Sequence, residues 1–203
     1  MNKVSGILLS LFMVFSVSSV GYSSPMEKLT DCFINSCVMV ECRYELTLHG
    51  TLVKGDAVVQ VQGTSYRMTA GGLDSFCDGH TLWTIDNEAM EAVAEPVEDG
   101  PAGYAANPAL LIMRLGDAFD VEKSSSSNGR WIYVLSAKTD CGIKKAEIVM
   151  TSAGILIQGK FSLSDGTVVK MEVISMTSSA LKPASYFRPE TNFGKTWVVT
   201  DLR

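Results

Sequence analysis

The sequence has 203 residues, of which 46% are apolar and 19% charged, and a formal net charge of −5. This length and apolar content suffice for one domain of ordinary size with a real core, or for two small ones. The mild acidity, without any basic run, argues against nucleic acid and anionic lipid surfaces as main partners.

The N-terminus has the features of an export signal. Lys3 forms a short basic region, and the apolar run ILLSLFMVFSVSSV (residues 7–20) is too short to span a bilayer but has the length of a signal core. Small residues in the following SSVGYSS offer cleavage sites after Gly21 or Ser23. We therefore expect a signal peptide at residues 1–23 and an exported mature domain over residues 24–203.

Cysteine and histidine contents bear on disulfides and metals. Five cysteines follow the signal, an odd number, so at least one thiol stays free, and the sequence does not fix the pairing. The first three are each separated by four residues, which is not a familiar zinc pattern, and only His49 and His80 are available. We expect no metal site and no cofactor. The cysteines are Cys32, Cys37, Cys42, Cys77 and Cys141.

The first predicted elements are a helix and a long strand. Residues 25–36 (PMEKLTDCFINS) predict an amphipathic helix, with Pro25 near its start and apolar residues at helical spacing. From residue 38 to 48 apolar residues alternate with polar ones, which is typical of a strand with one buried face. Its apolar positions are Val38, Val40, Cys42, Tyr44, Leu46 and Leu48.

Shorter alternating segments follow, and turn residues separate them. Strands are predicted near residues 57–62, 65–70, 81–85, 88–94, 131–137, 144–150, 154–161 and 167–176. The turn signals are Gly55–Asp56, Gly63, Gly71–Gly72, Asp78–Gly79, Asp86–Asn87 and Asp165–Gly166. The stretch DGHTLW (78–83) is therefore interpreted as a β-turn whose Asp–Gly pair needs no catalytic role.

Three segments interrupt the strands. Residues 95–108 form an acidic loop rich in Pro and Gly, and residues 123–130 (KSSSSNGR) are expected to be a flexible polar loop. Between them, residues 107–116 predict a helix, which Asn107 caps and Gly116 ends. We see no internal repeat and no domain boundary.

The fold class predicted from these elements is α+β, with a single strongly curved antiparallel sheet, an incomplete β-barrel, and helices covering its concave face. Two helices of about a dozen residues, each roughly 10 Å wide, do not cover eight or more strands spaced about 4.8 Å apart. A partly filled apolar cavity follows, which suits an apolar ligand. The alternative from pattern alone is a sheet that closes into a packed barrel or sandwich.

Motifs for catalysis are scarce. The sequence contains no Gly-x-Ser-x-Gly, no P-loop and no Gly-x-Gly-x-x-Gly motif. His49 lies on the polar phase of its strand and His80 lies beside a turn, so each is expected to be a surface residue. We expect no enzyme; the rival hypothesis is an exported enzyme that uses Cys77 or Cys141 as nucleophile.

Several motifs, in order, resemble those of the LolA-like outer-membrane lipoprotein carriers, in particular the Bacteroides-type members. They are the Gly-led strand at 50–54, the Tyr-Arg strand at 66–68, Asp78–Trp83 with His80 in place of the usual Lys, and NPALLI (107–112). The closing segment YFRPETNFGKTWVVTDLR (186–203), with its terminal Asp-Leu-Arg, also matches. The resemblance covers roughly residues 26–203. No single motif is specific to the family. The order and spacing of the motifs, together with the signal peptide, support the resemblance.

The resemblance implies a periplasmic carrier that takes acylated lipoproteins from an inner-membrane ABC transporter to the outer membrane, where the acceptor is unknown. A monomer is expected. In the family an Arg-Pro pair after the early strand holds the lid; here only Lys54 stands near that point, so the gating residue stays open. The alternative is a periplasmic binding or sensor module for another lipid or amphiphile on the same scaffold.

We expect the acyl chains to contact the apolar phase of the strands and the helix at 107–116. Moving a dozen methylenes into such a cavity gains roughly 10 kcal/mol, at about 0.8 kcal/mol each. The expected lining residues are Val40, Tyr44, Leu46, Leu48, Val59, Val61, Tyr66, Met68, Leu110, Leu111, Met113, Ile148, Met150, Val169, Met171 and Val173. The alternative for each of these residues is that it packs in the protein core and does not contact a ligand.

Overall fold

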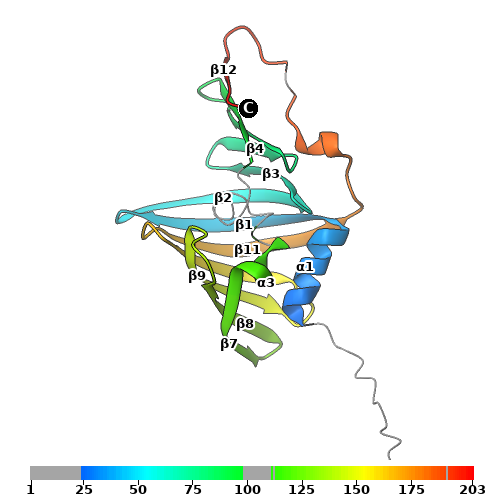
Figure 1. The fold of residues 1–203 in the computed structure, drawn as a ribbon, viewed down its shortest axis with the longest axis vertical. Coiled ribbons are helices and arrows are strands. Elements are labelled where there is room, and N and C mark those ends of the chain that lie inside the picture. The colour runs from blue at the N-terminus through cyan, green and yellow to red at the C-terminus, as the bar shows by residue number, and fades with distance from the viewer. Residues whose placement is uncertain (1–23, 98–110, 112, 191) are drawn as a thin grey trace, which may run out of the picture.

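The computed structural model describes residues 24–97, 111, 113–190 and 192–203. Strands dominate the described chain, and they form one sheet (Figure 1). The elements are α1 (Pro25–Asn35), β1 (Cys37–Leu48), β2 (Thr51–Gln62), β3 (Ser65–Ala70), β4 (Leu73–Cys77), β5 (Thr81–Asp86), β6 (Glu91–Pro96), α3 (Leu115–Ala118), β7 (Phe119–Ser127), β8 (Arg130–Ala137), β9 (Ile143–Thr151), β10 (Leu156–Leu163), β11 (Val168–Ser179), the 3-10 turn η2 (Ala184–Phe187) and β12 (Val198–Asp201).

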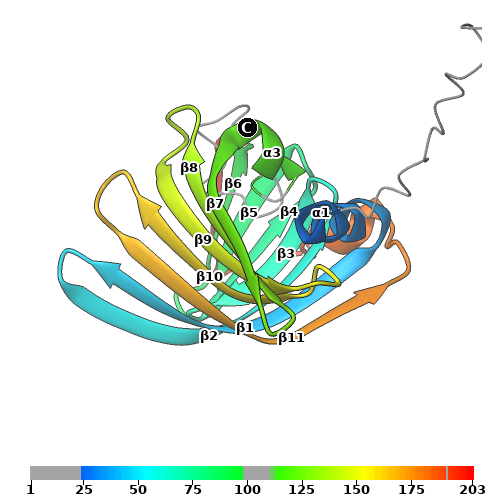
Figure 2. The same ribbon diagram turned by 90° about the horizontal axis from the view of Figure 1, so that it is seen from below.

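The sheet has twelve strands in the order β12-β6-β5-β4-β3-β2-β1-β11-β10-β9-β8-β7. Neighbouring strands are antiparallel except for β12, which pairs with β6 in parallel. Strands β7 and β12 end the sheet and do not pair with each other, so the sheet is not closed. Figure 2 shows the sheet curving around α1 and α3. The predicted fold class, a single curved antiparallel sheet with helices on its concave face, is confirmed.

Helix α1 begins where the sequence predicts and lies on the concave face. Ser24 caps it, since its hydroxyl accepts from the Glu27 amide while Glu27 accepts from the Ser24 amide in return. Leu29 and Phe33, one helical turn apart, are buried against the sheet. The Phe33 carbonyl accepts from the Gly63 amide at 3.0 Å, which fixes the end of the helix to the β2–β3 turn.

The main core lies between these helices and the apolar phase of the central strands. Val38 and Val40 of β1 face Val61 and Val59 of β2, and all four belong to this core or pack against it. The opposite phase of β1 carries Arg43, Glu45 and the other polar side chains. Alternation therefore divides each central strand into an apolar concave face and a polar opposite face, as predicted.

Further buried apolar residues lie on the other face of the sheet. Trp83 and Ile85 of β5 and Phe187 of η2 are all buried, and all three lie outside the main core. Near them Asp78 accepts from the guanidinium of Arg188 at 2.8 Å. The segment after β11 thus returns over the face that α1 does not cover.

Two predicted connections are wrong. Residues 123–130 are not a loop: Lys123–Ser127 belong to β7, and Asn128–Gly129 make the tight turn into β8. Serine has a weak preference for strands, but the backbones of these serines pair with residues of β8 in the antiparallel ladder. Gly55–Asp56 is not a turn, because both residues lie inside β2; the β1–β2 turn is His49–Gly50, where both φ angles are positive. His49 thus lies in this turn rather than in the strand.

Other predicted features fall outside the described residues or concern the thiols. The signal peptide (1–23), most of the loop at 95–108 and half of the helix at 107–116 lie outside, although Glu95 and Pro96 belong to β6. The predicted helix end at Gly116 is wrong, because this residue lies inside α3. No described helix has the length and hydropathy needed to traverse a bilayer. All five cysteines are described, and no disulfide links any two of them.

Candidate functional site

An apolar pocket lies between α1, α3 and the concave face of the sheet, with a free volume of about 160 Å³. Its lining is apolar throughout, apart from the thiol of Cys42. The residues are Leu29 and Phe33 of α1, Leu111, Leu115 of α3, Val40, Cys42, Val59, Val61, Ile148, Leu156, Phe161 and Met171. Such a site offers no charge and almost no hydrogen bonding, so it suits hydrocarbon.

Strand register explains how the sheet side of the pocket is assembled. Val40 lies directly across from Val59, and Val61 follows two residues later on the same face of β2. On the other side Gly159 separates Ile148 of β9 from Met171 of β11. Because Gly159 has no side chain at this central position, the space above it is left to Phe161, whose ring would stand 2.9 Å from an added Cβ.

The two helical elements close the pocket from the other side. Lys28 of α1 donates to the Ser152 carbonyl at 3.1 Å. Gly154 lies so close to α1 that an added Cβ would stand 2.9 Å from the Leu29 amide nitrogen. The N-terminal half of α1 is therefore held by the β9–β10 turn, and its end is held by Gly63.

Six of the sixteen predicted lining residues line this pocket. They are Val40, Val59, Val61, Leu111, Ile148 and Met171. Tyr66 and Met150 are fully buried in the adjoining core, and Met68 and Val173 pack against it. These four residues lie on the apolar phase of their strands, but they contact other protein side chains and do not line the apolar pocket.

The remaining predicted residues lie elsewhere. Tyr44, Leu46, Leu48 and Val169 continue the same phase toward the hairpin ends, beyond the pocket, and Leu48 is 39% exposed. Met113 is half-buried and does not line the pocket, and Leu110 lies outside the described residues. Strand curvature, which alternation does not reveal, decides where the apolar phase lies under the helices.

The prediction missed six lining residues. Leu29 and Phe33 carried a signal in their four-residue spacing, and Cys42 lies in phase with Val40. Leu115, Leu156 and Phe161 gave only the general signal of apolar residues in predicted elements. Burial raises the pKa of the Cys42 thiol, and the carboxylate of Asp56 raises it further. The thiol is therefore neutral at pH 7.

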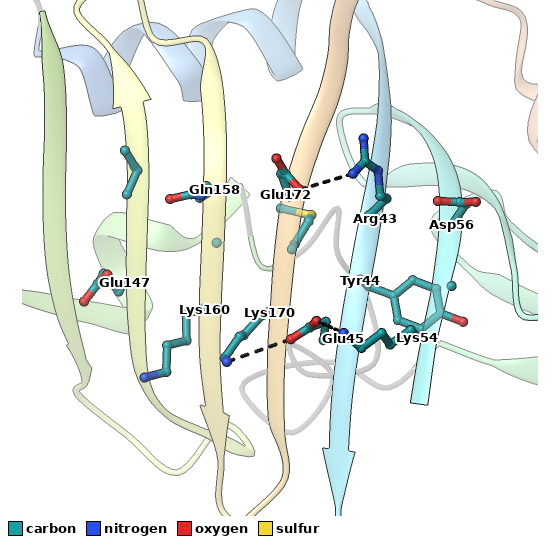
Figure 3. A pocket seen from close by; sticks show the side chains of 14 residues that line it. Arg43, Tyr44, Glu45, Lys54, Asp56, Glu147, Gln158, Lys160, Lys170 and Glu172 are labelled. Carbon is teal, nitrogen blue, oxygen red and sulfur yellow. Dashed lines mark hydrogen bonds and ion pairs between the residues drawn. The ribbon is translucent and has the colours of Figure 1, made fainter. Parts of the chain in front are cut away.

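A larger hollow, of about 740 Å³, lies on the opposite, polar face of the sheet (Figure 3). Glu147, Lys160, Lys170, Glu45 and Lys54 form one row across five adjacent strands. Glu45 pairs with Lys54 and with Lys170, the latter at 3.9 Å. The hydrogen bond from Lys54 lowers the pKa of Glu45.

A second row on this face contains Arg43, which lies 3.7 Å from Glu172. With four cations and four carboxylates in its lining, the groove has no net charge. It is larger than the apolar pocket, but its charges make it a poor environment for hydrocarbon. The apolar pocket is therefore the candidate acyl site.

No three or more His, Cys, Asp or Glu side chains gather in the described chain in a way that would hold a metal ion. Asp78 accepts from the His80 and Thr81 amides at 3.0 and 2.9 Å, so DGHTLW is the predicted turn. The Cys77 and Cys141 thiols are buried and contact the backbone carbonyls of Thr64 and Ile143.

Comparison with known proteins supports the fold. No protein-family model and no curated protein sequence matches this chain. A conserved uncharacterised protein from Thermus thermophilus superposes with a TM-score of 0.53 at 12% identity, covering 87% of this chain and 96% of the other. That similarity extends over nearly the whole of both chains and shows a shared fold.

Two further solved structures are less similar. A LolA superfamily protein from Nitrosomonas europaea has a TM-score of 0.45 at 13% identity, covering 81% of this chain and 96% of its own. A DUF1329 family protein from Desulfovibrio piger has a TM-score of 0.42 at 8% identity, with 82% and 98% covered.

Proposed function

We propose that this chain is a periplasmic carrier that binds the acyl chains of lipoproteins in the apolar pocket and moves them from the inner to the outer membrane. The observation that carries the proposal is the pocket between α1, Leu115 of α3 and the concave face. Its lining is apolar except for one thiol. The sequence resemblance to LolA-like carriers supports the same function. Its donor is then an inner-membrane ABC transporter.

The size of the pocket sets the mechanism. A cavity of about 150 Å³ holds a molecule the size of benzene, and the pocket here has about 160 Å³. A whole acyl chain therefore enters only when α1 and α3 move away from the sheet. Leu29 and Phe33 then exchange contacts with the sheet for contacts with the chain, so the apolar area exposed to water changes little.

The same exchange allows release. Each methylene bound gains about 0.8 kcal/mol, but returning α1 to the sheet restores the core contacts of Leu29 and Phe33 and offsets part of this gain. The polar contacts that hold α1 down are few, among them the Lys28 bond to Ser152 and the Gly63 bond to Phe33. A carrier needs such a balance, because it must hand over its cargo.

The small volume favours one alternative, a binding or sensor module for a single-chain amphiphile. Native mass spectrometry of the protein purified from the periplasm without detergent distinguishes the two. A bound acylated lipoprotein supports the carrier, and a bound fatty acid or phospholipid supports the alternative. An abundant protein that carries neither, and that takes up neither when they are added, contradicts both.

A further inference from the structure

A small pocket of about 200 Å³ lies on the face opposite α1, where η2 crosses β2 and β3. The Tyr186 hydroxyl donates to the Gln60 side-chain oxygen at 2.7 Å and anchors η2 to β2. Val58, Gln60, Arg67, Met68, Thr69 and Tyr186 line the pocket. It is separate from the apolar pocket, because Gln60 and Arg67 lie on the other phase of their strands from Val59 and Val61.

Arg67 is held in place by two aromatic rings. Its guanidinium carbon stands 5.2 Å from the centre of the Phe76 ring and 5.0 Å from that of Tyr186. Both distances lie in the range of cation–π attraction, and Arg67 as a residue is half-buried. Contacts with rings orient a guanidinium but use none of its N–H donors.

No carboxylate pairs with Arg67 in the part of the chain that the structure describes. Its direct neighbours across the ladder are Gln60 and Phe76, which are neutral. The nearby acids of the same sheet face have other partners: Asp74 accepts from Thr69 at 2.6 Å and from Asn87 at 2.8 Å, and Asp78 accepts from Arg188. The planar fork of Arg67 thus has donors without an acidic acceptor.

Two further groups favour an anionic acceptor in this pocket, one by its charge and one as a hydrogen-bond donor. The Lys182 ammonium stands 5.8 Å from the centre of the same Tyr186 ring. Among the described residues the Gln60 amide nitrogen donates only to the sulfur of Met39, at 3.5 Å, and sulfur is a weak acceptor. A stronger acceptor in the pocket would therefore find donors from both Arg67 and Gln60.

We propose that this pocket binds an oxyanion, a carboxylate or phosphate group, through the side-chain fork of Arg67 with support from Gln60. A guanidinium fork matches the two oxygens of either group, and a partly desolvated site strengthens the bond. The site lies across the sheet from the acyl pocket, so it can be occupied together with it.

Titration of the full chain with sodium phosphate and with sodium acetate tests the proposal. It is followed by the NMR signals of the Arg67 side-chain Nε–H and of the Gln60 side-chain amide, and the amide signal is also present in the Arg67 variant. A saturable shift with either anion is the expected result, and the stronger anion identifies the ligand chemistry. Arg67→Lys keeps the charge but loses the fork, so its affinity should fall at least tenfold. Arg43→Lys, on the same face and paired with Glu172, is the matched control and should bind as wild type.

Two outcomes overturn the proposal. One is a lack of any saturable shift of Arg67 with both anions. The other is equal anion affinity of the Arg67→Lys and Arg43→Lys variants. Because Arg67 also holds Tyr186, thermal unfolding of both variants verifies that they are folded, and Tyr186→Phe, which keeps the ring but loses the bond to Gln60, should still bind the anion.

Discussion

The ring of Tyr44 lies against Gly55, its direct partner across the β1–β2 ladder, and a Cβ added to Gly55 would stand 2.6 Å from the Tyr44 hydroxyl oxygen. Gly55 thus fits a strand interior because an aromatic side chain from the neighbouring strand covers it. The pair explains why a glycine that is typical of turns lies in the middle of β2.

The Gly55→Ala variant should be less stable than wild type by about 1–2 kcal/mol, because the methyl group displaces the Tyr44 ring. In a Tyr44→Ala background the same change should cost less than about 0.5 kcal/mol, since the clash is gone. Urea unfolding of the four proteins measures the coupling. Gly116→Ala is the control, because nothing lies within 4 Å of its added Cβ. Equal costs in both backgrounds would contradict the contact.

The contact between Gly154 and α1 gives a second prediction. Gly154→Ala should lower the free energy of unfolding by more than Gly129→Ala does. Both glycines have positive φ, at +81° and +73°, so both substitutions are strained, but only at Gly154 does the new methyl meet the backbone of α1. We expect an excess cost of about 1–3 kcal/mol, as for overpacking. Thermal unfolding of both variants measures it, and equal costs would show that α1 is not held there.

Cys42 reports on opening of the apolar pocket. The residue is 4% exposed and the pKa of its thiol is raised, so alkylation by N-ethylmaleimide at pH 7 should be much slower than at half-buried Cys32. Gly154→Ala should speed the labelling of Cys42, because it loosens α1, and bound oleate should slow it. Peptide mapping by mass spectrometry follows each thiol separately. Labelling of Cys42 as fast as that of Cys32 in the wild type would contradict a closed pocket.

The Asp78 carboxylate predicts a pH dependence of stability. Burial opposes its ionisation, but bonds from the Thr81 and His80 amides and from Arg188 together hold its pKa below the usual value. A lowered folded-state pKa means that the stabilisation is present above about pH 4, the unfolded value, and is lost as the pH falls through the folded pKa.

The Asp78→Asn variant should therefore be less stable than wild type at pH 7, by about 1–3 kcal/mol, and the difference should shrink in acid. Urea unfolding at pH 7 and at pH 3 measures it. Asp140→Asn, at an exposed loop position, is the control and should match the wild type. A difference between Asp78→Asn and wild type that stays constant down to the lowest pH would contradict the ionic role.

The sequence predicted those features that depend on the spacing of apolar residues over a short stretch of chain. Alternation identified the concave phase of β1 and β2, and four-residue spacing identified α1, because burial on one face imposes these periods directly. The Asp78 turn followed from its side chain and the next glycine. Each of these features is decided within a few residues along the chain.

Features that depend on distant partners were not predictable in the same way. The serines of β7 become a strand through pairing with β8, and Gly55 belongs to a strand through Tyr44. Phe187 is buried because the segment that carries it, after β11, returns over the sheet. For the pocket, alternation proposed apolar residues along the whole length of the strands, whereas curvature selected those under α1, leaving Leu48 exposed and adding Phe161.

Acyl binding in the apolar pocket is measured most directly by titrating a fluorescent fatty acid into folded variants of the full chain. Val59→Phe fills the pocket, whereas Ile132→Phe places the same ring on the opposite face of the sheet, at a residue that is 38% exposed. We predict that Val59→Phe weakens binding at least tenfold and that Ile132→Phe binds as wild type. Wild-type affinity in a folded Val59→Phe variant would contradict acyl binding at this site.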